Sequence, residues 1–212
     1  MDTLQALSLA MGTAWTSGIN LYATVGALGI AGRMQMIQLP ANLEVLTHPA
    51  VIAVACVMYL IEFFADKVPY VDNGWDVIHT FIRVPAGAML AARSLGDLDP
   101  ALEVAALLAG GAVALAAHGA KTTTRLALNV SPEPFSNWFA SVTEDLVVLG
   151  SIWMIFHHPL LMLILVVGFL ALIVWLTPKL LRLAKRGFQA LRDRMRGVKP
   201  DQPAPTGSPQ LG

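Results

Sequence analysis

Apolar runs close to the length of a membrane-spanning helix recur along the chain. A helix needs about 20 apolar residues to cross the ~30 Å hydrocarbon core of a bilayer. Six runs approach that length: Leu4–Gly32, Pro49 to about Phe64, Trp75–Ala92, Ala101 to about Leu128, Phe135–Phe156 and Leu160–Leu176. This pattern predicts an all-α integral membrane protein with about six transmembrane segments, joined in part by polar turns that break the helices.

The first run is too long for one straight crossing. As a single helix, Leu4–Gly32 would extend roughly 43 Å at 1.5 Å per residue, so it must tilt strongly or break. We expect a break within Thr16–Asn20, where Ser17, Gly18 and Asn20 could open the backbone. If this run is re-entrant rather than spanning, the N-terminus changes sides and the rest of the topology stands.

The composition agrees with a membrane protein. Of the 212 residues, 56% are hydrophobic and 13% are charged, whereas an ordinary soluble domain carries about 25% charged residues. A soluble chain of this length could not hide so many apolar helices from water. The single cysteine, Cys56, lies inside an apolar run, so an internal disulfide is excluded.

Lysine and arginine concentrate after the last apolar run. Eight of the 14 lie between Lys179 and Lys199, opposed there only by Asp193. The positive-inside rule therefore places the C-terminus in the cytoplasm. The first residues lack the basic n-region of a conventional signal peptide. We expect a multi-pass protein of a bacterial-type cytoplasmic (inner) membrane.

Three regions follow from these patterns. Residues 1–178 form the predicted transmembrane domain, residues 179–199 a basic amphipathic helix on the cytoplasmic membrane surface, and residues 200–212 a disordered tail. For residues 179–199, a stop-transfer anchor with a solvated basic tail is an equally good interpretation.

Two parts of the transmembrane domain resemble each other. When Pro69 is placed on Pro132, Trp75 meets Trp138, Thr80 meets Thr143 and Gly87 meets Gly150 without a gap. We interpret this as an internal duplication, with units at about 49–95 and 101–157. Paired helix interruptions in two matching halves point to a binding site in transporters.

Ionisable residues interrupt the second to fifth runs at helical spacing. Residues three or four apart share a helix face, so each of the four helices carries one polar stripe. A charge near the bilayer centre costs at least about 2.5 kcal/mol unless it meets a partner or water. We therefore predict that the four stripes face one another around a polar cavity in the cytoplasmic half of the membrane.

The predicted substrate or ion pathway consists of polar residues in these stripes, in the turns and at the broken first run. They are Asn20, Tyr22, Glu62, Asp66, Lys67, Asp72, Asp76, His79, Arg83, His118, Lys121, Arg125, Glu133, Asn137, Ser141, Glu144 and Asp145. The candidates for proton or cation coupling are Glu62, Asp66, His118 and Asp145. The candidates for neutralising an anionic group are Arg83, Lys121 and Arg125.

Other interpretations of these residues stay open. The acidic residues of the second and fifth runs could simply pair with the basic residues of the third and fourth, joining the helices. Asn20 and Tyr22 could bind solute at the break or cap a kink. Histidine with carboxylate suits zinc or manganese, but no HxxxH or HExxH spacing is present, so we expect no metal and no cofactor.

Three motifs carry a resemblance to a known family. The stretches SGINLYATV, EFFADKVPYVDNGWDVIHTFIR and SPEPFSNWFASVTED resemble the signatures of a family of small multi-spanning bacterial membrane proteins. That family is known only as a domain of unknown function. The resemblance covers roughly residues 15 to 150 and implies that the polar motifs are the family's core. It implies no substrate, activity or cofactor.

The sequence favours a small transporter or permease for a solute or ion, with proton coupling as one mode. The alternatives are a membrane-embedded enzyme acting on a lipid or prenyl phosphate, with His79, Asp76 and Glu144 as acid and base, and a structural scaffold. We assign no catalytic residue. The expected partners are the lipid bilayer and a small solute or ion, without nucleic acid, and self-association is left open.

Overall fold

The computed structural model describes residues 1–67, 71–128 and 134–195, and within these ranges the secondary structure is entirely helical. The helices are α1 (Thr3–Arg33), the short 3₁₀ helix η1 (Ala41–Thr47), α2 (Pro49–Ala65), α3 (Val71–Ser94), α4 (Pro100–Leu128), α5 (Pro134–His157) and α6 (Pro159–Met195). The chain divides into two units, Met1–Ala171 and Leu172–Gly212.

Among the described residues, three helices are long and apolar enough to cross a membrane: Pro100–Leu128, Phe135–His157 and Pro159–Arg182. The pair η1 and α2, bent by 65°, adds a fourth if it is one broken span. The all-helical class is therefore confirmed, and three helices have the length and composition of membrane spans, whereas six crossings are not confirmed. Helices α1 and α3, which correspond to the first and third predicted segments, are not among these candidate spans. Helix α1 is broken, and α3 is rich in ionisable residues.

Helix α1 is two half-helices joined at Asn20. The backbone of Asn20 is extended, with φ −148° and ψ 100°. Its side-chain oxygen accepts a hydrogen bond from the backbone N–H of Ala23 at 2.9 Å, as the first residue of a new helix does. The predicted break within Thr16–Asn20 is confirmed, and asparagine is suited to it because it caps the second half-helix.

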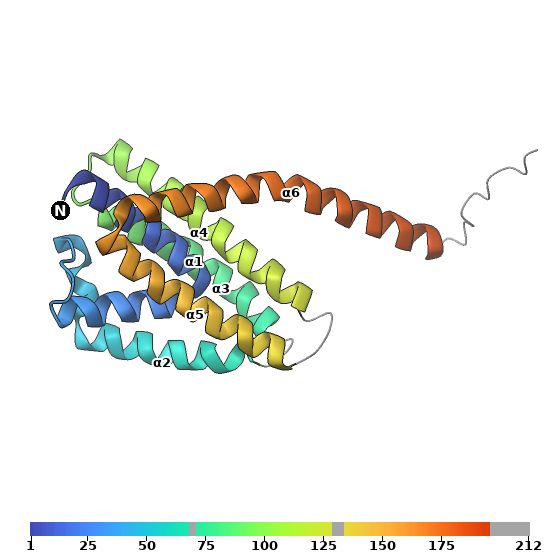
Figure 1. Ribbon diagram of the computed structural model, residues 1–212, viewed down its shortest axis with the longest axis horizontal. Coiled ribbons are helices and arrows are strands. Elements are labelled where there is room, and N and C mark those ends of the chain that lie inside the picture. The colour runs from blue at the N-terminus through green and yellow to red at the C-terminus, as the bar shows by residue number, and fades with distance from the viewer. Residues whose placement is uncertain (68–70, 129–133, 196–212) are drawn as a thin grey trace, which may run out of the picture. The chain divides into compact units, whose positions relative to one another are not determined.

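The two halves of α1 return to the same end of the first unit (Figure 1). Near the chain start, the Ser8 hydroxyl lies 3.4 Å from the carbonyl oxygen of Ile155, close to the end of α5. Near the end of α1, Gly29 packs on Leu46 in η1, beside the start of α2. Between them, Asn20 contacts Asp145, in the middle of α5. The first predicted segment is thus re-entrant in shape, with its turn inside the bundle.

Small residues let α1, α3 and α4 approach closely. A β-carbon at Gly18 would collide with the carbonyl oxygen of Ala114 on α4, and one at Gly87 on α3 would collide with the Ala114 side chain. Close approach through glycine and alanine is typical of helix packing in membranes. The contact face of α4 includes Gly110, Ala114 and Ala117, whereas Ala112 is exposed.

The second unit contains the later part of α6, which remains helical to Met195. Its Lys179 ammonium lies 3.0 Å from the centre of the Trp175 ring, a cation–π contact. The assignment of residues 179–199 to a membrane-surface helix remains a prediction, as does the boundary at residue 178. The predicted tail, 200–212, lies outside the described residues.

The contact between α1 and α4 gives a stability prediction. Gly18→Ala should destabilise the protein by about 1–3 kcal/mol, because the added methyl group overpacks a rigid contact between backbones. Gly119→Ala is the matched control, since a β-carbon there meets nothing within 4 Å. Thermal unfolding of the two purified variants in detergent should show a lower midpoint for Gly18→Ala alone. Equal midpoints would contradict the packing described for Gly18.

Candidate functional site

Four buried or partly buried carboxylates and three buried cations meet where α2, α3, α4 and α5 converge. In the described part of the chain, seven contacts of 2.6–3.4 Å join them. We call this cluster the ion-pair network; its members are Glu62, Asp66, Asp76, Arg83, Lys121, Arg125 and Glu144. Because each helix supplies one face at helical spacing, the predicted convergence of the polar stripes is present in the structure.

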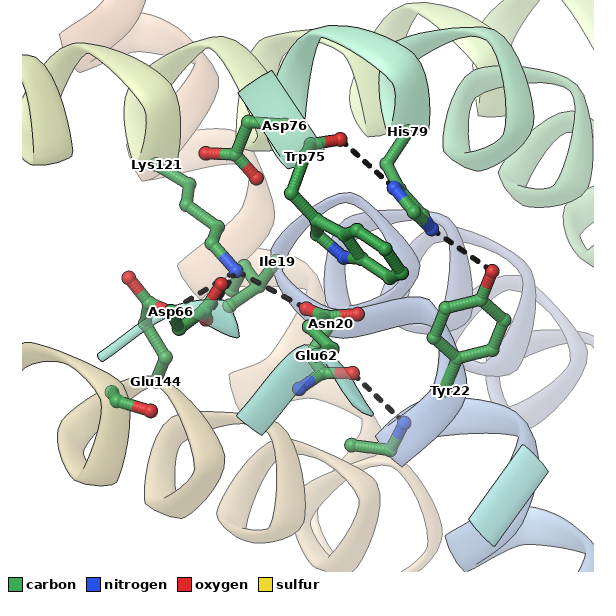
Figure 2. A network of polar contacts seen from close by, with 12 residues as sticks. Ile19, Asn20, Tyr22, Glu62, Asp66, Trp75, Asp76, His79, Lys121 and Glu144 are labelled. Carbon is green, nitrogen blue, oxygen red and sulfur yellow. Dashed lines mark hydrogen bonds and ion pairs between the residues drawn. The ribbon is translucent and has the colours of Figure 1, made fainter. Parts of the chain in front are cut away.

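Lys121 is the hub of the ion-pair network. Its ammonium contacts Glu62 at 3.2 Å, Asp66 at 3.1 Å and Glu144 at 3.3 Å. Figure 2 shows its side chain extending from α4 toward Asp66 and Glu62, which come from α2. The lysine side chain is 1% exposed, so these carboxylates take the place of water around the ammonium. One cation therefore holds α2 and α5 to α4.

Arg83 joins α3 to the break in α1. Its guanidinium contacts Glu62 at 2.6 Å and Asp76 at 3.4 Å. It also donates to the backbone carbonyl of Ile19 at 3.3 Å. The helical partner of that carbonyl would be the N–H of Ala23, which the Asn20 side chain has taken. Breaking α1 thus exposes a carbonyl oxygen that a buried arginine satisfies.

Arg125 lies at the edge of the network, next to the end of α2 and the start of α5. It binds both oxygens of Glu144, at 3.0 and 2.8 Å, in the bidentate geometry that favours arginine over lysine. It also donates to the backbone carbonyls of Asp66 and Asn137. The end of α2 and the start of α5 are therefore tied to the same guanidinium.

Two buried histidines, His118 and His79, flank the network. Nδ1 of His118 lies 3.1 Å from the donating guanidinium of Arg83, and its Nε2 lies 3.0 Å from the carbonyl oxygen of Asp76. Nδ1 of His79 lies 2.8 Å from the carbonyl oxygen of Trp75, and its Nε2 lies 3.1 Å from the Tyr22 hydroxyl (Figure 2). Nδ1 of His118 must accept, because its partner is a guanidinium, and Nδ1 of His79 must donate, because its partner is a carbonyl oxygen.

Asp145 lies at the edge of the site and differs from the other carboxylates. Its oxygens accept from the Tyr59 hydroxyl at 2.8 Å and from the Asn20 amide at 3.3 Å. Among the described residues, no lysine or arginine lies within ion-pair distance of Asp145. The neighbouring Glu144 contacts Lys121 and Arg125 instead. Two consecutive residues of α5 thus have different electrostatic surroundings.

Lys67 lies just beyond the end of α2. Its ammonium donates to the carbonyl oxygen of Phe63 at 2.9 Å and sits over the Phe63 ring, 2.8 Å from the ring centre. It also approaches the hydroxyl of Ser141 at 3.5 Å. Burial lowers the pKa of Lys67, because removal from water disfavours the charged form.

The hollows of the structure lie beside the ion-pair network. The α2–α5 groove, floored by α1, has a volume of about 720 Å³ and includes Tyr22, Gly26, Tyr59, Asp145, Trp153 and Phe156. The α4–α5 groove, of about 450 Å³, includes Trp15, Lys121, Phe139, Glu144 and Phe169. Both are lined mainly by apolar side chains. Asp145 reaches the first groove and Glu144 the second.

Most of the predicted pathway residues are thus gathered in one region. The network and the residues next to it include Asn20, Tyr22, Glu62, Asp66, Asp76, His79, Arg83, His118, Lys121, Arg125, Glu144 and Asp145. Three more predicted residues lie near the end of α2 and the start of α5: Lys67, Asn137 and Ser141. The charged groups pair with one another rather than lining an open polar cavity. Glu133 and the side chain of Asp72 lie outside the described residues.

Sequence reasoning missed Tyr59 and Thr122. Tyr59 bonds Asp145, and the Thr122 hydroxyl lies 3.4 Å from a carboxylate oxygen of Asp76. A signal for Tyr59 was present, because it precedes Glu62 by three residues and so shares its helix face. A signal for Thr122 was present as well, because it lies four residues after His118 and three before Arg125 on the same helix.

The fold and the site define an all-helical integral membrane protein with a buried ion-pair network around a broken helix. The chain belongs to the family described as Domain of unknown function (DUF4126), whose model matches residues 7–179. The suspected membership of such a family is thereby confirmed. No curated protein and no solved structure is detectably similar to this chain.

Removing one charge from the network should be costly. Glu62→Gln leaves Arg83 without its closest carboxylate and should destabilise the protein by about 3–5 kcal/mol, as when one partner of a buried ion pair is removed. Glu44→Gln is the control, because Glu44 is exposed on η1. Thermal unfolding in detergent provides the comparison.

The double variant Glu62→Gln/Arg83→Gln tests whether the two side chains stabilise the protein through their direct ion pair. It should lose less stability than the sum of the two single losses, because each single variant leaves an uncompensated buried charge. Strict additivity would contradict direct coupling between Glu62 and Arg83.

Proposed function

We propose that this protein is a small membrane transporter for a solute or ion, with transport coupled to proton exchange. The transported species passes between α1, α2, α4 and α5, and binds where the break in α1 meets the ion-pair network. The cytoplasmic (inner) membrane, with the C-terminus inside, is part of this proposal and rests on the charge distribution of the sequence.

The observation that supports it best is the broken, re-entrant α1. Its turn at Asn20 contacts Arg83 through the Ile19 carbonyl and Asp145 through the Asn20 amide. Irregular backbone at membrane depth is tolerated where protein or a polar cavity surrounds it. Transporters use the ends of such half-helices, near the middle of the bilayer, to hold substrates and coupling ions.

The network also retains capacity to bind. In the described residues, Oε2 of Glu62, Oδ1 of Asp66 and Nε of Arg83 are buried without a hydrogen-bond partner. Buried polar atoms are normally paired, so these atoms are suited to a transported species or to water that accompanies it. Four carboxylates against three cations also leave the network acidic.

Asp145 is our candidate for the coupling residue. Glu62 and Asp66 are held by the network cations, and His118 accepts from Arg83. Asp145 has only neutral donors, Tyr59 and Asn20, and borders the larger groove. A carboxylate without a counter-ion in a low-dielectric setting readily takes up a proton or a cation.

The internal duplication and the number of crossings belong to this proposal as well. The polar residues lie near the ends of α2 and α4 and in the first half of α3 and α5, which fits two units of similar design. With a re-entrant α1, we propose crossings by α2 to α6 and an N-terminus on the outer side. The enzyme alternative gains no support, since network cations engage both Asp76 and Glu144.

A flux measurement tests this function. Proteoliposomes loaded with a pH-sensitive dye and given an outward proton gradient are exposed in turn to inorganic ions, zwitterionic amino acids and organic amines. The wild-type protein should dissipate the gradient only when its transported species is present. Asp145→Asn should abolish that response, since the amide cannot exchange a proton.

Thr123→Val is the matched control. Thr123 is exposed on α4, lines neither of the two grooves, and its hydroxyl donates to the carbonyl of Gly119 on its own helix. It should keep the wild-type response. Full activity in a folded Asp145→Asn protein, or no response to any solute class, would rule out the proposed coupled transport.

A further inference from the structure

We infer that the α2–α5 groove is a binding site for a hydrophobic organic cation, with the ammonium group held by Asp145. This deepens the proposed function, on which it rests, by naming the chemical class of the transported species. The inference depends on the groove's shape, its lining and the isolation of one carboxylate.

The groove has the size and surface of a small-molecule site. Its volume of about 720 Å³ falls within the roughly 300–1,000 Å³ range of ligand pockets. Its walls are mainly apolar, and Gly26 and Ala27 on the floor of α1 leave room for a ligand. A ligand that fits such a surface must itself be largely apolar.

Asp145 supplies the charge that such a ligand must match. It is half-buried, borders the groove and, within the described residues, lacks a lysine or arginine at ion-pair distance. Lys121 acts on Asp145 only from beyond ion-pair distance, so this half-buried carboxylate is incompletely compensated. A cationic ligand in the groove would add a counter-charge in direct contact, whereas an anion would be repelled.

Aromatic rings favour the same class. Tyr22, Tyr59, Trp153 and Phe156 line the groove. The electron-rich face of an aromatic ring attracts ammonium and guanidinium groups, and Trp and Tyr do so most strongly. Carboxylate, aromatic rings and an apolar wall together are the chemistry that recognises a substituted ammonium ion.

The α4–α5 groove of the same protein differs from the α2–α5 groove in the surroundings of its carboxylate. It is also apolar, but its carboxylate, Glu144, is already neutralised by Arg125 at 2.8 Å and Lys121 at 3.3 Å. An added cation would meet two positive charges there. The predicted preference for cations therefore applies to the α2–α5 groove and not to its neighbour.

Equilibrium dialysis with the full-length protein in phosphatidylcholine nanodiscs tests this inference. The probes are octyltrimethylammonium, octanol and octanoate, with empty nanodiscs subtracting partition into lipid. The cation should bind saturably and at least about tenfold more tightly than the alcohol, because only the cation pairs with a buried carboxylate. Asp145→Asn should remove this preference.

Two further variants keep the test decisive. Gly26→Leu fills the groove while retaining Asp145 and should weaken cation binding; a β-carbon at Gly26 meets only Ala55, at 3.7 Å. Thr123→Val should bind as the wild type does, because Thr123 lines neither groove. If Asp145→Asn fails to fold, Gly26→Leu and the comparison of the three probes decide the matter.

The outcomes separate this inference from the proposed function. Equal binding of octanol and octyltrimethylammonium, or unchanged cation binding in folded Asp145→Asn or Gly26→Leu proteins, would overturn the cation site. Coupled flux of another solute class without cation binding would overturn the site alone. Saturable cation binding that depends on Asp145, without any flux, would uphold the site and refute transport.

Discussion

The structure depends on one constraint: every charge taken into the bundle needs an opposite charge or a polar group beside it. Lys121 satisfies this requirement for α2 and α5 at once, since Glu62, Asp66 and Glu144 all lie within 3.3 Å of its ammonium. Arg83 does the same for α3 and the interrupted α1. Because desolvated ions are stable only in well-formed pairs, charge matching constrains the relative positions of these helices in addition to the close packing of α1, α3 and α4.

The break in α1 is inseparable from this arrangement. A continuous helix would have bonded the Ile19 carbonyl to the Ala23 amide; the extended Asn20 supplies a replacement acceptor for the amide and leaves the carbonyl to Arg83. Gly18, immediately before, permits α4 to lie against the backbone of α1. A short polar segment thus ends one half-helix, begins another and brings both ends to the charged centre of the bundle.

Two arguments determine how much the sequence could predict: the helical spacing of polar residues and the free-energy cost of placing a charge inside a membrane. They were sufficient for the helices, for the break near Asn20 and for the meeting of Glu62, Arg83, Lys121 and Arg125, because residues on one face of a helix must point the same way. They could not separate the roles of Glu144 and Asp145, which adjoin in sequence and differ only in which neighbours surround them. The contact face of α4 could not be predicted either, since alanine and glycine occur on several of its faces and the sequence carries no information on which one meets α1.

The adjacency of Glu144 and Asp145 has a mechanical consequence. Successive residues project about 100° apart around a helix. The two carboxylates therefore leave α5 in different directions, Asp145 toward the α2–α5 groove and Glu144 toward the α4–α5 groove. A rotation of α5 about its own axis would therefore move both carboxylates at once, each relative to a different groove.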